Sequence, residues 1–126
     1  MNIYKMRKAK ILIFILFFPF YFSFSSSKEG AILVEKLNCL ACHDFSQKRT
    51  GPSFAEIAKK YGTSKKAVEK VAKIIINPPS FMPPFKIPIS QAKEVAKYIL
   101  EEGAKYNKVE ENKIYDEYID LEMQSH

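Results

Sequence analysis

The chain lacks several features that would widen the range of folds and functions open to it. Its 126 residues include no tryptophan, only four glycines and only two cysteines. No segment alternates between apolar and polar residues as a half-buried strand does, so an all-α fold is predicted. Internal repeats and long glycine- or serine-rich linkers are also missing, which favours one small domain. Because no long basic run with interleaved aromatic residues occurs, we do not expect a nucleic-acid partner.

The first 27 residues have the composition of an export signal. Four basic residues precede an almost wholly apolar run from Ile11 to Phe24, and Ser25, Ser26 and Ser27 then supply small residues for cleavage. The run is short for a spanning helix, which needs about 20 apolar residues, and Pro19 interrupts it. We therefore predict a signal peptide over 1–27, cleaved near residues 25–28, and a periplasmic protein. A retained membrane anchor is the alternative, and the only reason to expect membrane association.

Charge divides the remaining chain into two parts. Residues 28–97 contain 13 basic and 6 acidic side chains, whereas 98–126 contain 3 basic and 8 acidic ones. We predict a folded domain over 28–105 and an acidic C-terminal extension over 106–126. In the extension Ile114, Tyr118 and Leu121 could share one helix face, but acidic residues crowd them. A mostly solvated, partly helical extension is expected.

Apolar periodicity and capping residues predict four helices in the domain. They cover 29–38, 53–61, 64–76 and 91–102. The expected capping residues are Ser53 with Glu56, Thr63 or Ser64, and Ser90 at helix starts, and Gly62 and Gly103 at helix ends. A stiff loop from Asn77 to Ile89 contains five prolines and separates the last two helices.

Both cysteines lie in one motif, Cys39-x-x-Cys42-His43, for which three chemistries come into question. A structural zinc site needs four ligands, and the only other histidine is His126. A thioredoxin-like dithiol opens a helix after a strand, whereas this motif follows a predicted helix. Covalent attachment of a c-type haem fits best, because the two thiols can add to the haem vinyl groups and His43 is then placed to ligate the iron.

A second axial ligand must come from farther along the chain. Met82 stands in the proline-rich loop between Phe81 and Pro83, on a stiff apolar segment. The rivals after the motif, Met123 and His126, both lie in the acidic extension. We therefore predict Met82 as the second ligand of the haem iron. The cofactor would also add apolar surface to the core, because so small a domain would bury only a marginal core without it.

These residues resemble class I cytochromes c, in particular the small bacterial monohaem type. The resemblance covers 29 to about 105 and includes the Cys39–His43 motif, Gly51-Pro52-Ser53-Phe54, Met82-Pro83-Pro84 and the last predicted helix. It implies a small cytochrome c fold of three to five short helices wrapped around one covalently bound haem. The residues that it implies for the haem are thioether-forming Cys39 and Cys42, axial ligands His43 and Met82, and pocket residues Pro52, Phe54 and Ile57, with Ile74 and Ile75 beside them.

The resemblance also implies that the Pro52 carbonyl accepts a hydrogen bond from the His43 ring. The chain departs from the family in its short run from Asn77 to Met82, which lacks the tryptophan or arginine that often contacts the haem propionates, so no propionate partner is predicted. It departs again at Phe85, where relatives often have asparagine, and in the acidic extension.

The function implied is one-electron transfer, not catalysis, because two axial protein ligands leave no open iron site. The expected role is a monomeric carrier in a periplasmic respiratory chain, with redox proteins as donor and acceptor, a terminal oxidase among the candidates. Cations at Lys48, Arg49 and Lys86 suggest docking on acidic partner surfaces. The alternatives are a cytochrome c subunit of a periplasmic oxidoreductase complex, for example in sulfur-compound oxidation, and a haem enzyme or gas sensor with a dissociable Met82.

Overall fold

The computed structural model describes residues 28–79 and 81–124. The predicted signal peptide and His126 lie outside these ranges. The elements in order are α2 (Lys28–Lys36), the 3-10 turn η2 (Cys39–Ala41), α3 (Phe54–Tyr61), α4 (Lys65–Ile76) and α5 (Ile89–Gln124). No strand occurs over the described ranges, and the all-α prediction is confirmed. None of these helices combines the length and apolarity that a membrane span requires.

The chain turns sharply between α2 and the cysteine motif. α2 ends at Lys36, two residues earlier than predicted, and Asn38 adopts a left-handed conformation with φ 55°. Asparagine tolerates this region better than most residues because its short polar side chain bonds locally. The turn leads directly into η2, so that both cysteines lie on a short, tightly wound segment instead of on a continued α2.

The predicted caps of α3 and α4 are confirmed. The Ser53 hydroxyl accepts a hydrogen bond from the Glu56 N–H (3.0 Å), and the Glu56 carboxylate accepts one from the Ser53 N–H (2.8 Å). Gly62 ends α3 with φ 76°, which a residue without Cβ adopts at little cost. Ser64 caps α4 by accepting a hydrogen bond from the Ala67 N–H (3.1 Å).

The predicted limits of the last helix are wrong at both ends. α5 begins at Ile89, so Ser90 lies within it, and the first turn is closed by a hydrogen bond from the Ala92 N–H to the Pro88 carbonyl (3.1 Å). The helix also continues through Gly103 to Gln124. A Cβ at Gly103 would overlap the Phe54 carbonyl. Gly103 is therefore required for close packing of α3 on α5 and does not end the helix.

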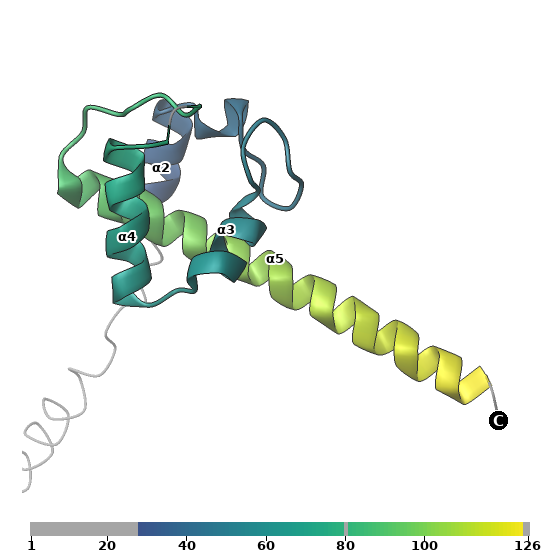
Figure 1. Ribbon diagram of the computed structural model, residues 1–126. Helices are drawn as coiled ribbons and strands as arrows, with labels where there is room; N and C mark the ends of the chain where they lie inside the picture. The colour runs from purple at the N-terminus through teal and green to yellow at the C-terminus, as the bar shows by residue number, and fades with distance from the viewer. Residues whose placement is uncertain (1–27, 80, 125–126) are drawn as a thin grey trace, which may run out of the picture.

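The core lies where α2, α3 and α4 pack on the first half of α5 (Figure 1). Its fully buried side chains include Phe54, Val95 and Leu100. At the edge of the domain, the Phe45 ring stacks on Tyr106 with 5.7 Å between ring centroids. The Asn107 side chain donates a hydrogen bond to the Ala55 carbonyl (2.9 Å). These two contacts fix the direction in which α5 leaves the domain.

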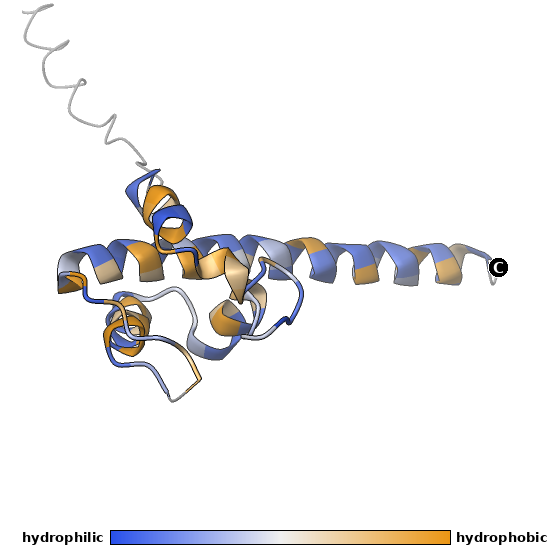
Figure 2. Ribbon diagram, turned by 90° about the horizontal axis from the view of Figure 1, so that it is seen from above, coloured by the Kyte–Doolittle hydropathy of each residue, from blue (hydrophilic) through white to orange (hydrophobic). Residues whose placement is uncertain are grey.

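Beyond Asn107, α5 projects away from the other helices (Figure 1). The extension is thus a continuous helix and not the partly helical segment that the sequence suggested. Hydrophobic residues recur among hydrophilic ones along this projecting end (Figure 2). Ile114, Tyr118 and Leu121 are each more than half exposed there.

Candidate haem site

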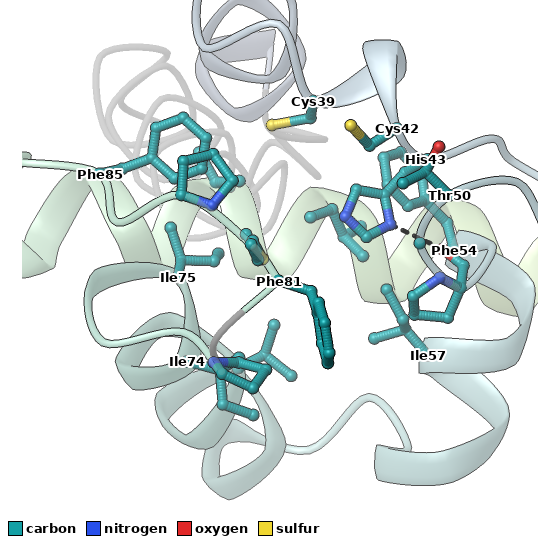
Figure 3. Close-up of a pocket in the computed structure, with 18 of the residues that line it drawn as sticks. Cys39, Cys42, His43, Thr50, Phe54, Ile57, Ile74, Ile75, Phe81 and Phe85 are labelled. Carbon is teal, nitrogen blue, oxygen red and sulfur yellow. Dashed lines mark hydrogen bonds between the residues drawn. The ribbon is translucent and has the colours of Figure 1, made fainter.

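A cavity of about 400 Å³ opens between the cysteine motif, α3, α4, the proline-rich loop and α5 (Figure 3). This volume lies within the range of about 300–1,000 Å³ that is usual for cofactor sites. Every residue that the sequence assigned to the haem lines the cavity: Cys39, Cys42, His43, Pro52, Phe54, Ile57 and Met82. Ile74 and Ile75 line it as well. The cysteine motif, the segment before α3, α3, α4 and the proline-rich loop thus each contribute a predicted residue to the wall of one cavity.

The two cysteines lie at one end of the cavity, with both sulfur atoms near its rim (Figure 3). Both are free thiols. Burial raises the pKa of the Cys39 thiol, while a backbone hydrogen bond acts weakly in the opposite direction. Cys39 is half-buried and Cys42 is exposed, so both thiols are accessible to a group that enters the cavity.

The His43 ring is held in one orientation. Its Nδ1 lies 2.7 Å from the Pro52 carbonyl oxygen (Figure 3), and because a carbonyl only accepts hydrogen bonds, the ring proton must be on Nδ1. The Nε2 lone pair is then free to bind a metal ion. A hydrogen bond of this kind fixes the tautomer and raises the basicity of a ligating imidazole. The hydrogen bond that the family resemblance implied is present.

Gly51 leaves room for this ring. A Cβ at Gly51 would lie 2.5 Å from Cε1 and 2.8 Å from Nδ1 of His43, distances that no side chain could maintain without displacing the ring. The Gly51 N–H also donates to the Cys42 carbonyl (2.8 Å). The glycine before Pro52 thus serves the orientation of His43 and not only the turn of the chain.

The loop from Asp44 to Gly51 is organised by a side-chain turn. The Asp44 carboxylate accepts hydrogen bonds from the N–H groups of Ser46 (2.9 Å) and Gln47 (3.0 Å). These bonds, that of Gln47 foremost, lower the pKa of Asp44. The Asp44 carbonyl in turn accepts from the Phe54 N–H (2.8 Å). The cysteine motif is thereby tied to the start of α3.

Met82 comes from the proline-rich loop between α4 and α5. Its N–H donates to the Pro79 carbonyl (3.0 Å), and the Phe85 N–H donates to the Ile75 carbonyl (3.4 Å). Figure 3 shows Phe85 on the far side of the cavity from His43. The loop therefore presents a thioether to a cavity whose other side carries an imidazole. A thioether and an imidazole are the axial pair of many c-type haems.

Most of the remaining wall is apolar. Val71, Val95 and Ile99 are buried members of the core and also line the cavity. They could be predicted from sequence only as core residues, since the periodicity of a helix does not say which of its buried positions face a cofactor. Thr50, Lys60 and Tyr61 also line the cavity, and nothing in the local sequence pattern indicated them.

The cavity suits a haem better than the two alternative cofactor chemistries. Between residues 28 and 124, leaving out residue 80, no cluster of three or more His, Cys, Asp or Glu side chains could hold a metal ion. The motif also follows the helix α2 and includes the 3-10 turn η2, and no strand precedes it in the described part of the chain. A flat apolar group with two vinyl substituents would meet two thiols at one end, an imidazole, a thioether and apolar walls. The residues present fit a covalently bound haem.

The fold and this cavity define a domain of the c-type cytochromes. Comparison with known families agrees, because residues 26–99 match the family described as "Cytochrome C oxidase, cbb3-type, subunit III". The match covers more than half of the chain, and the chain belongs to this family of cytochrome c domains.

Two relatives are small cytochromes c. The chain is 38% identical over 74 residues to cytochrome c-552 of Hydrogenobacter thermophilus. The aligned part covers 54% of this chain and 76% of the relative. It is similar to the crystal structure of wild-type Nitrosomonas europaea cytochrome c552, with a TM-score of 0.50 and 35% identity. That similarity covers 56% of this chain and 95% of the other. The cytochrome c fold and the haem c cofactor are confirmed, and the chain is a haem-based electron-transfer protein.

Proposed function

We propose that the protein is a monomeric one-electron carrier of a periplasmic respiratory chain, not an enzyme, with His43 and Met82 as axial ligands of one haem. The observation that carries this proposal is the Nδ1 hydrogen bond of His43, which leaves Nε2 for the iron in a cavity that Met82 also lines. The haem, when bound, supplies reversible one-electron chemistry. The protein's part is to hold both ligands and exclude water.

The site supports transfer rather than catalysis. None of the described residues that line the cavity is a carboxylic acid, and its histidine is the one already assigned to the iron. Neither a carboxylic acid nor a second histidine is therefore available on the described cavity wall as a general acid or base. The Pro52 carbonyl holds the His43 ring, and the proline-rich loop holds Met82. Both supports are rigid and favour the same coordination of the iron in its two oxidation states.

Exposed cations near the cavity suit acidic partner surfaces. Lys48, Arg49 and Lys86 are exposed, and the Arg49 guanidinium donates to the Leu40 carbonyl within the cysteine motif (3.1 Å). We propose that this face docks weakly and in a salt-dependent manner on the donor and the acceptor.

The ligand assignment predicts an optical result. The oxidised wild-type protein should show the weak sulfur-to-iron band at the red end of a c-type spectrum, and Met82→Ala should abolish it. The reduced Met82→Ala protein should also bind carbon monoxide, because one axial position is then open. Met123→Ala is the matched control, since this exposed methionine lies near the far end of α5. Its spectrum should be that of the wild type. A wild-type spectrum without the band would overturn the assignment and favour a gas sensor or haem enzyme.

A second candidate function, a cytochrome subunit of a periplasmic oxidoreductase complex, is favoured by the projecting end of α5. Ile114, Tyr118 and Leu121 are spaced so that they share one helix face. By the same helical spacing, Glu110 and Glu117 lie along one side of the apolar stripe that these three residues form. An exposed apolar stripe with an acidic border is more typical of a contact with a dedicated partner than of a freely diffusing carrier.

Deletion of residues 108–126 distinguishes the two candidate functions. The deletion leaves the Phe45–Tyr106 stack and the Asn107 hydrogen bond in place, so the spectrum and the thermal midpoint should change little. If the protein is a subunit, the full chain should co-elute with a complex on gel filtration of a native periplasmic extract, and the shortened chain should elute alone. Elution of both forms at monomer size would favour the free carrier.

A further inference from the structure

One part of the cavity wall is polar and positively charged. Of the described residues that line the cavity, Lys60 is the one cation, and none is acidic. Tyr61 follows it at the C-terminal end of α3 and also lines the cavity. A cation beside an otherwise apolar cavity predicts that the group bound there carries negative charge at this place.

Over residues 28–79 and 81–124, no carboxylate forms an ion pair with Lys60. Glu56, one helical turn earlier, has its carboxylate in the capping box of α3, where it accepts from the Ser53 N–H (2.8 Å). Among the ion pairs that the described residues form, none includes Lys60. Its Nζ instead lies 5.2 Å from the centroid of the Tyr61 ring, and Lys70 Nζ lies 5.4 Å from the same ring. Two ammonium groups thus lie near one aromatic ring, and neither forms an ion pair within the described part of the chain.

The cysteines determine which edge of a haem faces this charge. The vinyl groups and the two propionates of haem lie on opposite edges of the macrocycle. Figure 3 shows the sulfur atoms of Cys39 and Cys42 at one end of the cavity and Ile57 and Ile74, on α3 and α4, toward the other. Lys60 follows Ile57 by about one turn of α3. Thioether bonds to the cysteines would direct the propionates toward the end of α3.

We propose that Lys60 is the cationic partner of a haem propionate, that the Tyr61 hydroxyl donates a hydrogen bond to the same edge, and that Lys70 adds positive potential there. This inference rests on the proposed function, since it concerns the potential at which the carrier works. An ammonium group near the haem favours the reduced state, which carries one positive charge less than the oxidised state. The positive charge of Lys60 then raises the midpoint potential of the haem.

Substitution of Lys60 tests the proposal in the haem-loaded protein. Lys60→Gln should lower the equilibrium constant for reduction about fivefold, because the ammonium charge that is removed interacts with the charge of the haem iron across a partly solvated edge of the site. Fivefold corresponds to about 40 mV at 59 mV per tenfold for one electron. Lys60→Arg should keep the wild-type potential. Lys59→Gln is the matched control, because Lys59 is an exposed neighbour on α3 that does not line the cavity. Its effect should be less than twofold.

Spectroelectrochemical titration of the four proteins separates the outcomes. A drop confined to Lys60→Gln supports the proposal. Equal drops in Lys60→Gln and Lys59→Gln would show a general charge effect and overturn it, and so would a Lys60→Gln potential equal to that of the wild type. The sulfur-to-iron band, recorded on the same samples, reports on the proposed axial ligands. A wild-type protein without that band refutes the ligand assignment, whereas an unshifted Lys60→Gln potential in a protein with the band refutes only the role of Lys60.

Discussion

The chain without attached haem is expected to lose its cooperative unfolding transition. The cavity holds about 400 Å³, and at about 24 cal/mol per Å³ an unfilled apolar space of that size would cost up to about 10 kcal/mol. The whole stability of a small domain is about 5–15 kcal/mol. Because the cavity is lined by core residues of α3, α4 and α5, the loss is spread over the domain and is not confined to one loop. Water that enters the open cavity lowers the cost but does not restore the lost apolar contacts.

The measurement compares urea unfolding of three samples by circular dichroism. Two are haem-free: the wild-type sequence produced without haem attachment, and the exported Cys39→Ala/Cys42→Ala double variant. Both should have reduced helical signal and a broad, shallow transition, and agreement between them excludes an effect of the cysteine substitutions themselves. The haem-loaded wild type should unfold in a single steep transition. A haem-free chain with the same slope of free energy against urea as the loaded protein would contradict the prediction.

The sequence was sufficient to predict the elements whose ends are determined locally. Ser53 with Glu56, Gly62 and Ser64 satisfy the backbone of α3 and α4 through residues at most three positions away. The cysteine motif was equally informative, because two thiols and an imidazole at this spacing are compatible with few cofactors. Met82 was a candidate because prolines stiffen its loop, and it lies on the cavity wall. These three predictions rest on short-range geometry or on ligand chemistry, and none of them requires knowledge of the packed core.

The errors arise where packing over a long sequence distance overrides a local signal. Gly103 has the position of a helix-ending glycine, yet what requires a glycine there is the Phe54 backbone, some 50 residues earlier in the chain. The same limit applies to Lys60, which from sequence is one more exposed lysine on an amphipathic helix. Only the placement of α3 against the cysteine motif shows that Lys60 lines the cavity. Local rules describe a residue's neighbours in the chain, and these two residues are defined by neighbours in space.

Gly103→Ala should destabilise the protein strongly, although helix propensity alone predicts the opposite. Alanine is favoured over glycine in a helix interior by about 1 kcal/mol, and Gly103 lies well inside α5. The added Cβ would overlap the Phe54 carbonyl and crowd the Ala55 N–H, and backbone atoms cannot rotate away as a side chain does. Overpacking of this kind costs about 1–3 kcal/mol and sometimes more. We expect the steric term to exceed the propensity term and the net loss to be about 2 kcal/mol or more.

The displacement would also reach the haem site, which makes the prediction testable by two measurements. Phe54 packs against the His43 ring, with 6.1 Å between centroids, and follows the Pro52–Ser53 segment whose carbonyl holds that ring. Gly103→Ala should therefore lower the thermal midpoint by about 10 °C or more and also weaken the sulfur-to-iron band. Asn112→Ala is the control, because it improves helix propensity at an exposed position of the same helix and should leave both readings unchanged. A Gly103→Ala protein as stable as the wild type would mean that α3 and α5 can move apart at no cost, and that their packing does not require a glycine at residue 103.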